Sequence, residues 1–185
     1  KETRSVLVES RERIRKSLQS MKRAWEQTID VLAMAAETRD PYTAGHQRNV
    51  SALSEAIGVE MGLDEGTVNS LRMAGLVHDV GKINIPAEIL SKPGTLGEVE
   101  LALIRTHPEV GYDIMKNIEF PWRLADMILQ HHERMDGSGY PAGLKGEEIL
   151  LESRILAVAD VVEAMSSHRP YRASLGVEAA LEEIE

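Results

Sequence analysis

The sequence predicts an all-α protein, a helical bundle with a long helix at its N-terminal end. Apolar residues recur at spacings of three and four along most of the 185 residues, and no strand-like alternation lasts for more than a few residues. Glycine and proline separate the periodic stretches from one another, as they do between helices. A chain of this length fits one domain with a short extension, and it can bury a hydrophobic core.

Residues 1 to about 36 are predicted to form the long helix, since their apolar positions follow a heptad stripe that Arg11 interrupts. The stripe consists of Leu7, Ile14, Leu18, Met21, Trp25, Thr28, Leu32 and Ala35. It fits an amphipathic helix that packs on its own domain. It also fits a two-stranded signalling coiled coil that links this domain to an upstream sensor.

The ends of the chain indicate a piece of a larger protein, because it starts at Lys1 rather than Met and stops inside an apparent helix. We expect a linker helix over residues 1–27, which could form a homodimer. We expect a domain over residues 28–185, with a truncated C-terminus. An upstream sensor or receiver domain is an expected partner.

Shorter helices are predicted to follow, each bounded by a residue that favours a helix end. The Asp40–Pro41 pair ends the first helix, because a residue before proline disfavours the α conformation. A helix over about 45–61 ends at Gly62, and Asp64 caps the next helix, which runs to the HDVGK segment.

The second half of the chain is predicted to contain further helices separated by loops. Short helices are expected over 87–90 and 98–105. Pro108 is expected at the first position of another helix, and Pro121 at the start of the helix that ends in HHE. The stretch MDGSGYPAGLKGEE holds four glycines and a proline, and it is predicted to be a loop. A long helix over about 152–167 and one that begins within YRASLGVEAALEEIE complete the chain.

Charge and composition exclude several classes of function. The 30 acidic and 21 basic residues give a formal charge of −9, which argues against a nucleic-acid polymer as a partner. No cysteine is present, so disulfides, thiolate metal sites and cysteine nucleophiles are excluded. No apolar run approaches the roughly 20 residues that span a bilayer, and the charged start is no signal peptide. We therefore expect a cytoplasmic location and no membrane segment in this chain.

Most of the histidines are predicted to lie where helices start, end or meet loops. These are His46, His78, His107, His131 and His132, five of the six in the chain. A single histidine in such a place is more often structural than a ligand. Five of them together favour a metal site that is built without sulfur.

Two aspartates lie in apolar stretches, Asp79 in LVHDVG and Asp160 in ILAVADVV. A buried carboxylate costs several kcal/mol unless it is paired or bound to metal. An ion pair with Arg or His would satisfy each aspartate alone, whereas metal ions explain both aspartates and the histidines together. The set suits two ions with Asp79 as a candidate bridge, and such pairs hold a hydroxide for attack on phosphorus. Lys82 follows His78 by one helical turn, so it either faces a metal-bound phosphate or is solvated.

The strings HDVGK, HHERMDGSGYP and ADVVEAMSSHRPYR resemble the HD-GYP family of metal-dependent phosphodiesterases over roughly residues 28–175. The resemblance implies a helical bundle of the HD superfamily and hydrolysis of cyclic di-GMP to linear pGpG. The implied metal ligands are His46, His78 and Asp160 for one ion, His107, His131 and His132 for the other, and Asp79 as the bridge. The implied catalytic residues are Asp79 and Lys82, and the implied substrate contacts are Lys82, Tyr140, Arg169 and Arg172.

The sequence departs from the family at one position. Some members carry a glutamate four residues before the first ligand histidine and bind a third metal, but that position here is Tyr42. We therefore expect two divalent transition-metal ions. Iron or manganese is favoured, and nickel, cobalt or zinc also suits nitrogen and oxygen ligands. Cleavage of pGpG to GMP stays an open question, and His168 is expected to be exposed without a ligand role.

Other functions stay open at this point. The substrate could be a mixed GMP–AMP cyclic dinucleotide, because the implied contacts are mostly to phosphate. The GYP string disfavours a phosphohydrolase of linear nucleotides. The complete ligand set disfavours a non-catalytic module that only binds cyclic dinucleotide and signals through its helix. Docking of the GYP loop onto cyclase domains could accompany catalysis.

Overall fold

The structure of the chain is a computed structural model that describes residues 2–38, 45–167 and 174–184. Within these ranges every regular element is a helix, which confirms the all-α prediction. None of the described helices is long and apolar enough to cross a membrane. Tyr42, His168, Arg169 and Arg172 lie outside the described residues, so the expectations placed on them stay predictions.

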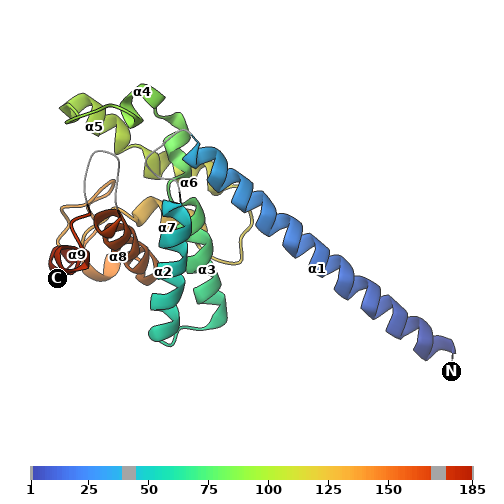
Figure 1. Ribbon diagram of the computed structural model, residues 1–185. Coiled ribbons are helices and arrows are strands. Elements are labelled where there is room, and N and C mark those ends of the chain that lie inside the picture. The colour runs from blue at the N-terminus through green and yellow to red at the C-terminus, as the bar shows by residue number, and fades with distance from the viewer. Residues whose placement is uncertain (1, 39–44, 168–173, 185) are drawn as a thin grey trace.

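The N-terminal helix α1, Glu2–Glu37, projects from the body of the protein and packs on it from Trp25 onward (Figure 1). Among its described side chains Ile29, Ala33 and Ala36 are buried, and the helix packs on α3 and the short helix η1. Four apolar residues of the stripe before Trp25 are more than half exposed, although Leu18 and Met21 line a groove with Phe120 and Trp122. The four exposed residues are Leu7, Ile14, Leu18 and Met21.

The buried face of α1 departs from the heptad stripe after Trp25. The stripe predicts Leu32 and Ala35 as contact residues, but Leu32 is 39% exposed, while Ile29 and Ala33 are buried. A straight α-helix has 3.6 residues per turn, so a 3.5-residue repeat drifts around its surface. The domain therefore contacts a face that is rotated from the stripe.

Helices α2, His46–Glu60, and α3, Glu65–Val77, form an antiparallel pair at the centre of the body. The carboxylate of Asp64 accepts hydrogen bonds from the backbone N–H groups of Gly66 and Thr67, which confirms Asp64 as the cap of α3. A 3₁₀ helix, η1, Val80–Asn84, follows α3 directly.

The middle of the chain supplies four further helices. They are α4, Ala87–Leu90; α5, Glu98–Ile104; α6, His107–Met115; and α7, Leu124–Gln130. Helix α6 packs against both η1 and α7. Pro108 lies in the first turn of α6, which starts one residue before the predicted position. The prediction that Pro121 starts the next helix is wrong. Helix α7 begins at Leu124, and Pro121 and Trp122 lie in a bend before it.

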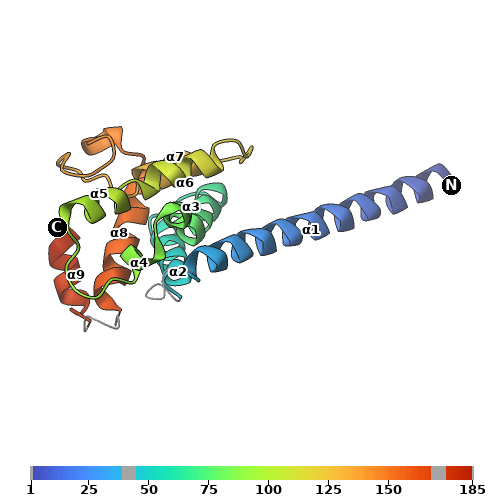
Figure 2. The same cartoon turned by 90° about the horizontal axis from the view of Figure 1, so that it is seen from above.

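The last part of the chain closes the bundle. A loop with a short 3₁₀ helix, η2, Gly146–Glu148, leads into α8, Leu151–Ser166, and α9, Val177–Ile184, follows. Helix α8 contacts α2, α3, α7 and α9, and it lies between them in the turned view (Figure 2). The core that these helices enclose includes Leu71, Met127 and Leu156. The N-terminal ends of α2 and α6, the C-terminal ends of α3 and α7, and the middle of α8 meet beside this core.

Candidate metal centre

Two clusters of possible metal ligands lie inside the bundle. The first consists of His46, His78 and Asp160, and the second of His107, His131 and His132. Within each cluster, one ligand atom from every residue lies within 4.8 Å of the others. All six residues are in the set that the sequence analysis expects, with the same division.

The histidines reach the centre because they stand at helix ends. His46 is the first residue of α2, and His107 is the first residue of α6. His78 directly follows α3, and His131 directly follows α7. Helix ends point into the same space, so residues far apart in the sequence converge there without a long loop.

Gly81 allows two of these segments to meet. A Cβ atom on Gly81 would overlap the carbonyl oxygen of His107 and would lie 2.6 Å from the amide nitrogen of Gly111. Only a residue without a side chain lets η1 approach the start of α6 this closely. The glycine of HDVGK therefore serves to bring the His78–Asp79 pair beside His107.

Asp79 lies between the two clusters. Its Oδ1 is 3.3 Å from Nε2 of His107, and its Oδ2 is 3.5 Å from Nε2 of His78. The side chain is buried, with 4% of its surface exposed. One carboxylate oxygen thus faces each cluster, which is the arrangement that a bridging ligand requires.

Backbone carbonyl groups orient three of the histidines. The Nδ1 atoms of His78, His107 and His131 lie 2.9, 2.7 and 2.5 Å from the carbonyl oxygen three residues earlier. A carbonyl oxygen only accepts, so each Nδ1 carries the hydrogen and each Nε2 presents a lone pair to the centre. Metal-ligating histidines are commonly fixed in this way.

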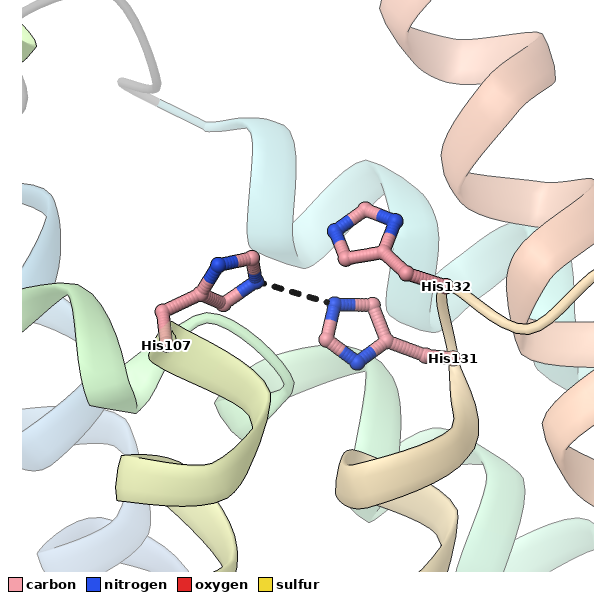
Figure 3. Close-up of side chains that lie close together, drawn as sticks. All are labelled: His107, His131 and His132. Atoms are coloured by element: carbon pink, nitrogen blue, oxygen red, sulfur yellow. Dashed lines mark hydrogen bonds between the residues drawn. The ribbon is translucent and has the colours of Figure 1, made fainter. Parts of the chain in front are cut away.

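The contact between His107 and His131 fits a metal ion. Their Nε2 atoms point at each other and are 3.2 Å apart (Figure 3). Burial lowers the pKa of both rings, so both are neutral, and their hydrogens are on Nδ1. Two facing lone pairs repel each other unless a cation lies between them. Two imidazole nitrogens bound about 2.1 Å from one ion would be about 3.0–3.4 Å apart, so the spacing suits one.

His78 gives a second indication of a cation. Its Nε2 is buried and makes no hydrogen bond to any described residue. Buried polar atoms nearly always have a partner, because an unsatisfied one costs about 1–3 kcal/mol. This nitrogen faces the carboxylates of Asp79 and Asp160, at 3.5 and 3.8 Å. Its surroundings are those of a ligand nitrogen.

The two clusters differ in their electrostatics. Burial lowers the pKa of His46, but hydrogen bonds to Asp160 and Glu163 outweigh it and raise that pKa to about 9. Burial lowers the pKa of His132 to about 4. Burial raises the pKa of Asp79, but the positive charge of Lys82 and the nearby histidines hold it well below the usual range. At neutral pH the first cluster therefore carries a proton that the second lacks.

Tyr140 covers the second cluster from the loop between α7 and α8. Its ring stacks on His132 with centroids 4.8 Å apart, and the guanidinium of Arg105 lies 5.5 Å from the ring centroid. The carboxylate of Glu133 holds this loop by accepting hydrogen bonds from the amides of Ala142 and Leu144. A cavity of about 480 Å³ opens beside these residues and is lined by Arg105, His132 and Tyr140 among others.

Three residues of the centre are not among those predicted from the sequence. Glu163 contacts Nδ1 of His46, Glu133 fixes the loop, and Arg105 lies over Tyr140. A glutamate in HHE or in DVVEAM carries no local signal that separates a buried carboxylate from an exposed one. For Arg105 the sequence does hold one signal, because this residue lies only two positions before the ligand candidate His107.

The chain is similar in sequence and in fold to known proteins. Residues 30–185 match the family model of the HD domain. The cyclic di-GMP phosphodiesterase response regulator RpfG of Xanthomonas campestris pv. campestris is 41% identical over 172 residues, which are 92% of this chain and 46% of that protein. The 3'3'-cGAMP-specific phosphodiesterase 3 of Vibrio cholerae is 36% identical over 153 residues, covering 83% of this chain and 33% of that protein.

A solved structure of Bd1817, an HDG"Y"P protein from Bdellovibrio bacteriovorus, superposes with a TM-score of 0.63. It is 22% identical and covers 75% of this chain and 44% of that chain. This likeness confirms the fold. The chain spans less than half the length of both curated relatives named here.

Proposed function

The chain belongs to the HD domain family, its motifs fit the HD-GYP group, and from this premise we propose that it hydrolyses cyclic di-GMP to linear pGpG. The observation that carries the proposal is the pair of three-residue clusters with Asp79 between them. The name of the relative from Xanthomonas campestris supports the choice of substrate.

We assign the two clusters to two divalent ions. His46, His78 and Asp160 hold one, His107, His131 and His132 hold the other, and Asp79 bridges them. Donors of nitrogen and carboxylate oxygen without sulfur favour iron or manganese over softer ions. When bound, such a pair supplies a hydroxide for attack on phosphorus and neutralises charge on the phosphoryl oxygens.

The side chains of this protein supply orientation and further charge. The backbone carbonyl groups behind His78, His107 and His131 keep their Nε2 atoms directed at the centre. Lys82 places its ammonium group at the edge of the site, where it can stabilise charge that develops on a phosphoryl oxygen. Tyr140, stacked on His132 and close to Arg105, lines the cavity in which a base or a ribose could be held. The phosphate contacts proposed for Arg169 and Arg172 would complete the anion site.

A second cyclic dinucleotide is a candidate substrate, because the relative from Vibrio cholerae is named as specific for 3'3'-cGAMP. The side chains that line the site offer positive charge and an aromatic ring. These groups suit phosphates and either purine base, so they do not separate guanine from adenine. Competition between the two cyclic dinucleotides in one reaction would give their relative rates directly.

The activity is tested by incubating the purified chain with cyclic di-GMP and Mn²⁺ or Fe²⁺ and separating the nucleotides by chromatography. We expect linear pGpG, with no product after chelation. Binding of the cyclic nucleotide without any product under either metal would refute turnover and leave a binding module. Parallel reactions with 3'3'-cGAMP compare the two substrates.

We also propose that residues 1–27 form a linker helix that joins two copies of the chain. The exposed apolar residues of α1 support this, because a stripe of Leu7, Ile14, Leu18 and Met21 is unusual on an isolated helix. Sedimentation of the chain with and without residues 1–20 tests it. An unchanged mass per particle, apart from the deleted residues, would count against the dimer.

A further inference from the structure

Glu163 is a buried carboxylate whose two oxygens both have partners. It lies on α8 one turn after Asp160, and 7% of its surface is exposed. Its Oε2 contacts Nδ1 of His46, while Oε1 accepts hydrogen bonds from Asn49, at 3.0 Å, and Ser167, at 2.8 Å. The carboxylate is therefore held in place through both of its oxygens.

His46 differs from the other histidines in what fixes its ring. His78, His107 and His131 each donate from Nδ1 to a backbone carbonyl. His46 is the first residue of its helix, and its Nδ1 donates to Glu163 instead. Because an ionised carboxylate only accepts, this contact keeps the hydrogen on Nδ1.

The opposite edge of the same ring faces Asp160. Nε2 of His46 is 3.1 Å from Oδ1 of Asp160. Asp160 and Glu163 are three residues apart on one helix, so their carboxylates reach opposite edges of one imidazole. The two carboxylates of α8 thereby fix the orientation of the His46 ring, with Nε2 on the side of Asp160.

We propose that Glu163 is a positioning residue that holds His46 in the tautomer and orientation required to bind an ion with His78 and Asp160. The inference rests on the ligand assignment proposed above. Partner carboxylates of this kind typically change metal affinity by about 10- to 100-fold when they are removed. Glu163 lies on the Nδ1 side of the ring, away from the other ligand atoms, and so is not itself a ligand.

The substitution Glu163→Gln separates these roles. If the amide NH₂ faces His46, Nδ1 must accept, the hydrogen moves to Nε2, and the ligand nitrogen is lost. If the amide oxygen faces His46, the NH₂ group points at the amide nitrogen of Asn49. Either way the preferred geometry is weakened while the side-chain volume is kept. Glu152→Gln on the same helix is the matched control, because it lies outside both clusters.

The experiment titrates metal-free protein with Co²⁺, using calorimetry for affinity and visible absorption for the geometry of the bound ion. We expect Glu163→Gln to weaken one of two binding events by about 10- to 100-fold and to leave the other unchanged. The absorption spectrum at saturating Co²⁺ should match the parent chain. Glu152→Gln should behave as the parent, and Glu163→Asp should recover part of the lost affinity.

Three results would overturn the inference. The first is parental affinity of Glu163→Gln at both events. The second is an equal loss at both events with a lowered melting temperature of the metal-free protein, which would make Glu163 a structural tie between α2 and α8. The third is a changed spectrum at saturation, which would make Glu163 a ligand.

If Glu163→Gln fails to fold, Ser167→Ala keeps the carboxylate and removes one of its hydrogen bonds. Ser167→Ala should weaken the same Co²⁺-binding event by about two- to fivefold. An unchanged Co²⁺ affinity would then refute the inference. Every readout is metal binding and not turnover. A chain that shows the Glu163 effect but cleaves no cyclic dinucleotide would refute the proposed function and keep the role of Glu163.

Discussion

The ammonium nitrogen of Lys82 lies 2.7 Å from Oδ2 of Asp79. The cation proposed to face the scissile phosphate is therefore paired with the carboxylate proposed to bridge the ions. Both side chains are largely buried, with 18% and 4% of their surfaces exposed. An ion bound at Asp79 would compete with Lys82 for that oxygen and would release the ammonium group toward substrate.

Replacing Lys82 by methionine should separate metal binding from catalysis. Lys82→Met keeps the length of the side chain but removes its charge, so Asp79 should bind Mn²⁺ as well as before or more tightly. The rate constant kcat for cyclic di-GMP should fall by about 10²–10³, because a charge near the phosphoryl group is lost. Metal titration and steady-state kinetics on the same preparation measure both. Lys92→Met, on the surface beside Glu100, is the control and should change neither.

Replacing Gly81 by alanine should separate η1 from the start of α6. The added methyl group meets backbone atoms of His107 and Gly111, which do not move independently. We expect the free energy of unfolding to fall by about 2–4 kcal/mol, as for overpacked sites, with loss of metal affinity. Urea denaturation measures it. Gly97→Ala is the control, since its Cβ would meet only a flexible side chain at 3.5 Å, and should cost less than about 1 kcal/mol.

Removing the carboxylate of Glu133 should affect substrate binding more than metal binding. Glu133→Ala leaves the amides of Ala142 and Leu144 without their acceptor and frees the loop that presents Tyr140. The expected result is a KM for cyclic di-GMP that rises about tenfold, with metal content per chain unchanged. Glu148→Gln, which changes an exposed cap in the same loop, should leave KM within twofold. Loss of metal from Glu133→Ala would contradict this role.

Metal binding should release protons unequally at the two clusters. The pKa of His46 is raised to about 9, so at pH 7 this ring carries a proton that it must lose to bind an ion. The pKa of His132 is lowered to about 4, and those of His107 and His131 are also lowered, so the second cluster is already deprotonated. Calorimetry at pH 7 in buffers of different ionisation enthalpy should detect about one proton released in one event and none in the other.

The affinity of the first cluster should then rise with pH up to about 9, whereas that of the second should be flat above about pH 6. Equal proton release in both events would contradict the assignment of His46.

Much of this centre could be predicted from local sequence. The helix periodicity and the cap at Asp64 depend on neighbouring residues, so α2 and α3 lie where they were expected. Histidines at helix ends and aspartates in apolar stretches predict a metal site, whereas the division into two clusters was implied by the resemblance to the HD-GYP family. The start of α7 was missed, because Pro121 suits both a first turn and the turn that precedes a helix.

Residues that act through tertiary contacts could not be predicted in the same way. Glu163 meets His46 across 117 positions of sequence, and no local pattern distinguishes it from a solvated glutamate. Gly81 could be read as a helix end, whereas its function is a close approach of two backbones. The buried face of α1 is set by the shape of the domain and not by the heptad stripe.

The most direct test of a two-ion phosphodiesterase is the rate of cyclic di-GMP hydrolysis as metal-free protein is titrated with Mn²⁺ under anaerobic conditions. The two clusters on either side of Asp79 predict that hydrolysis depends on both ions, so the rate should rise with the second equivalent and saturate at two ions per chain. Full activity at one ion per chain, or a requirement for three, would contradict the assignment.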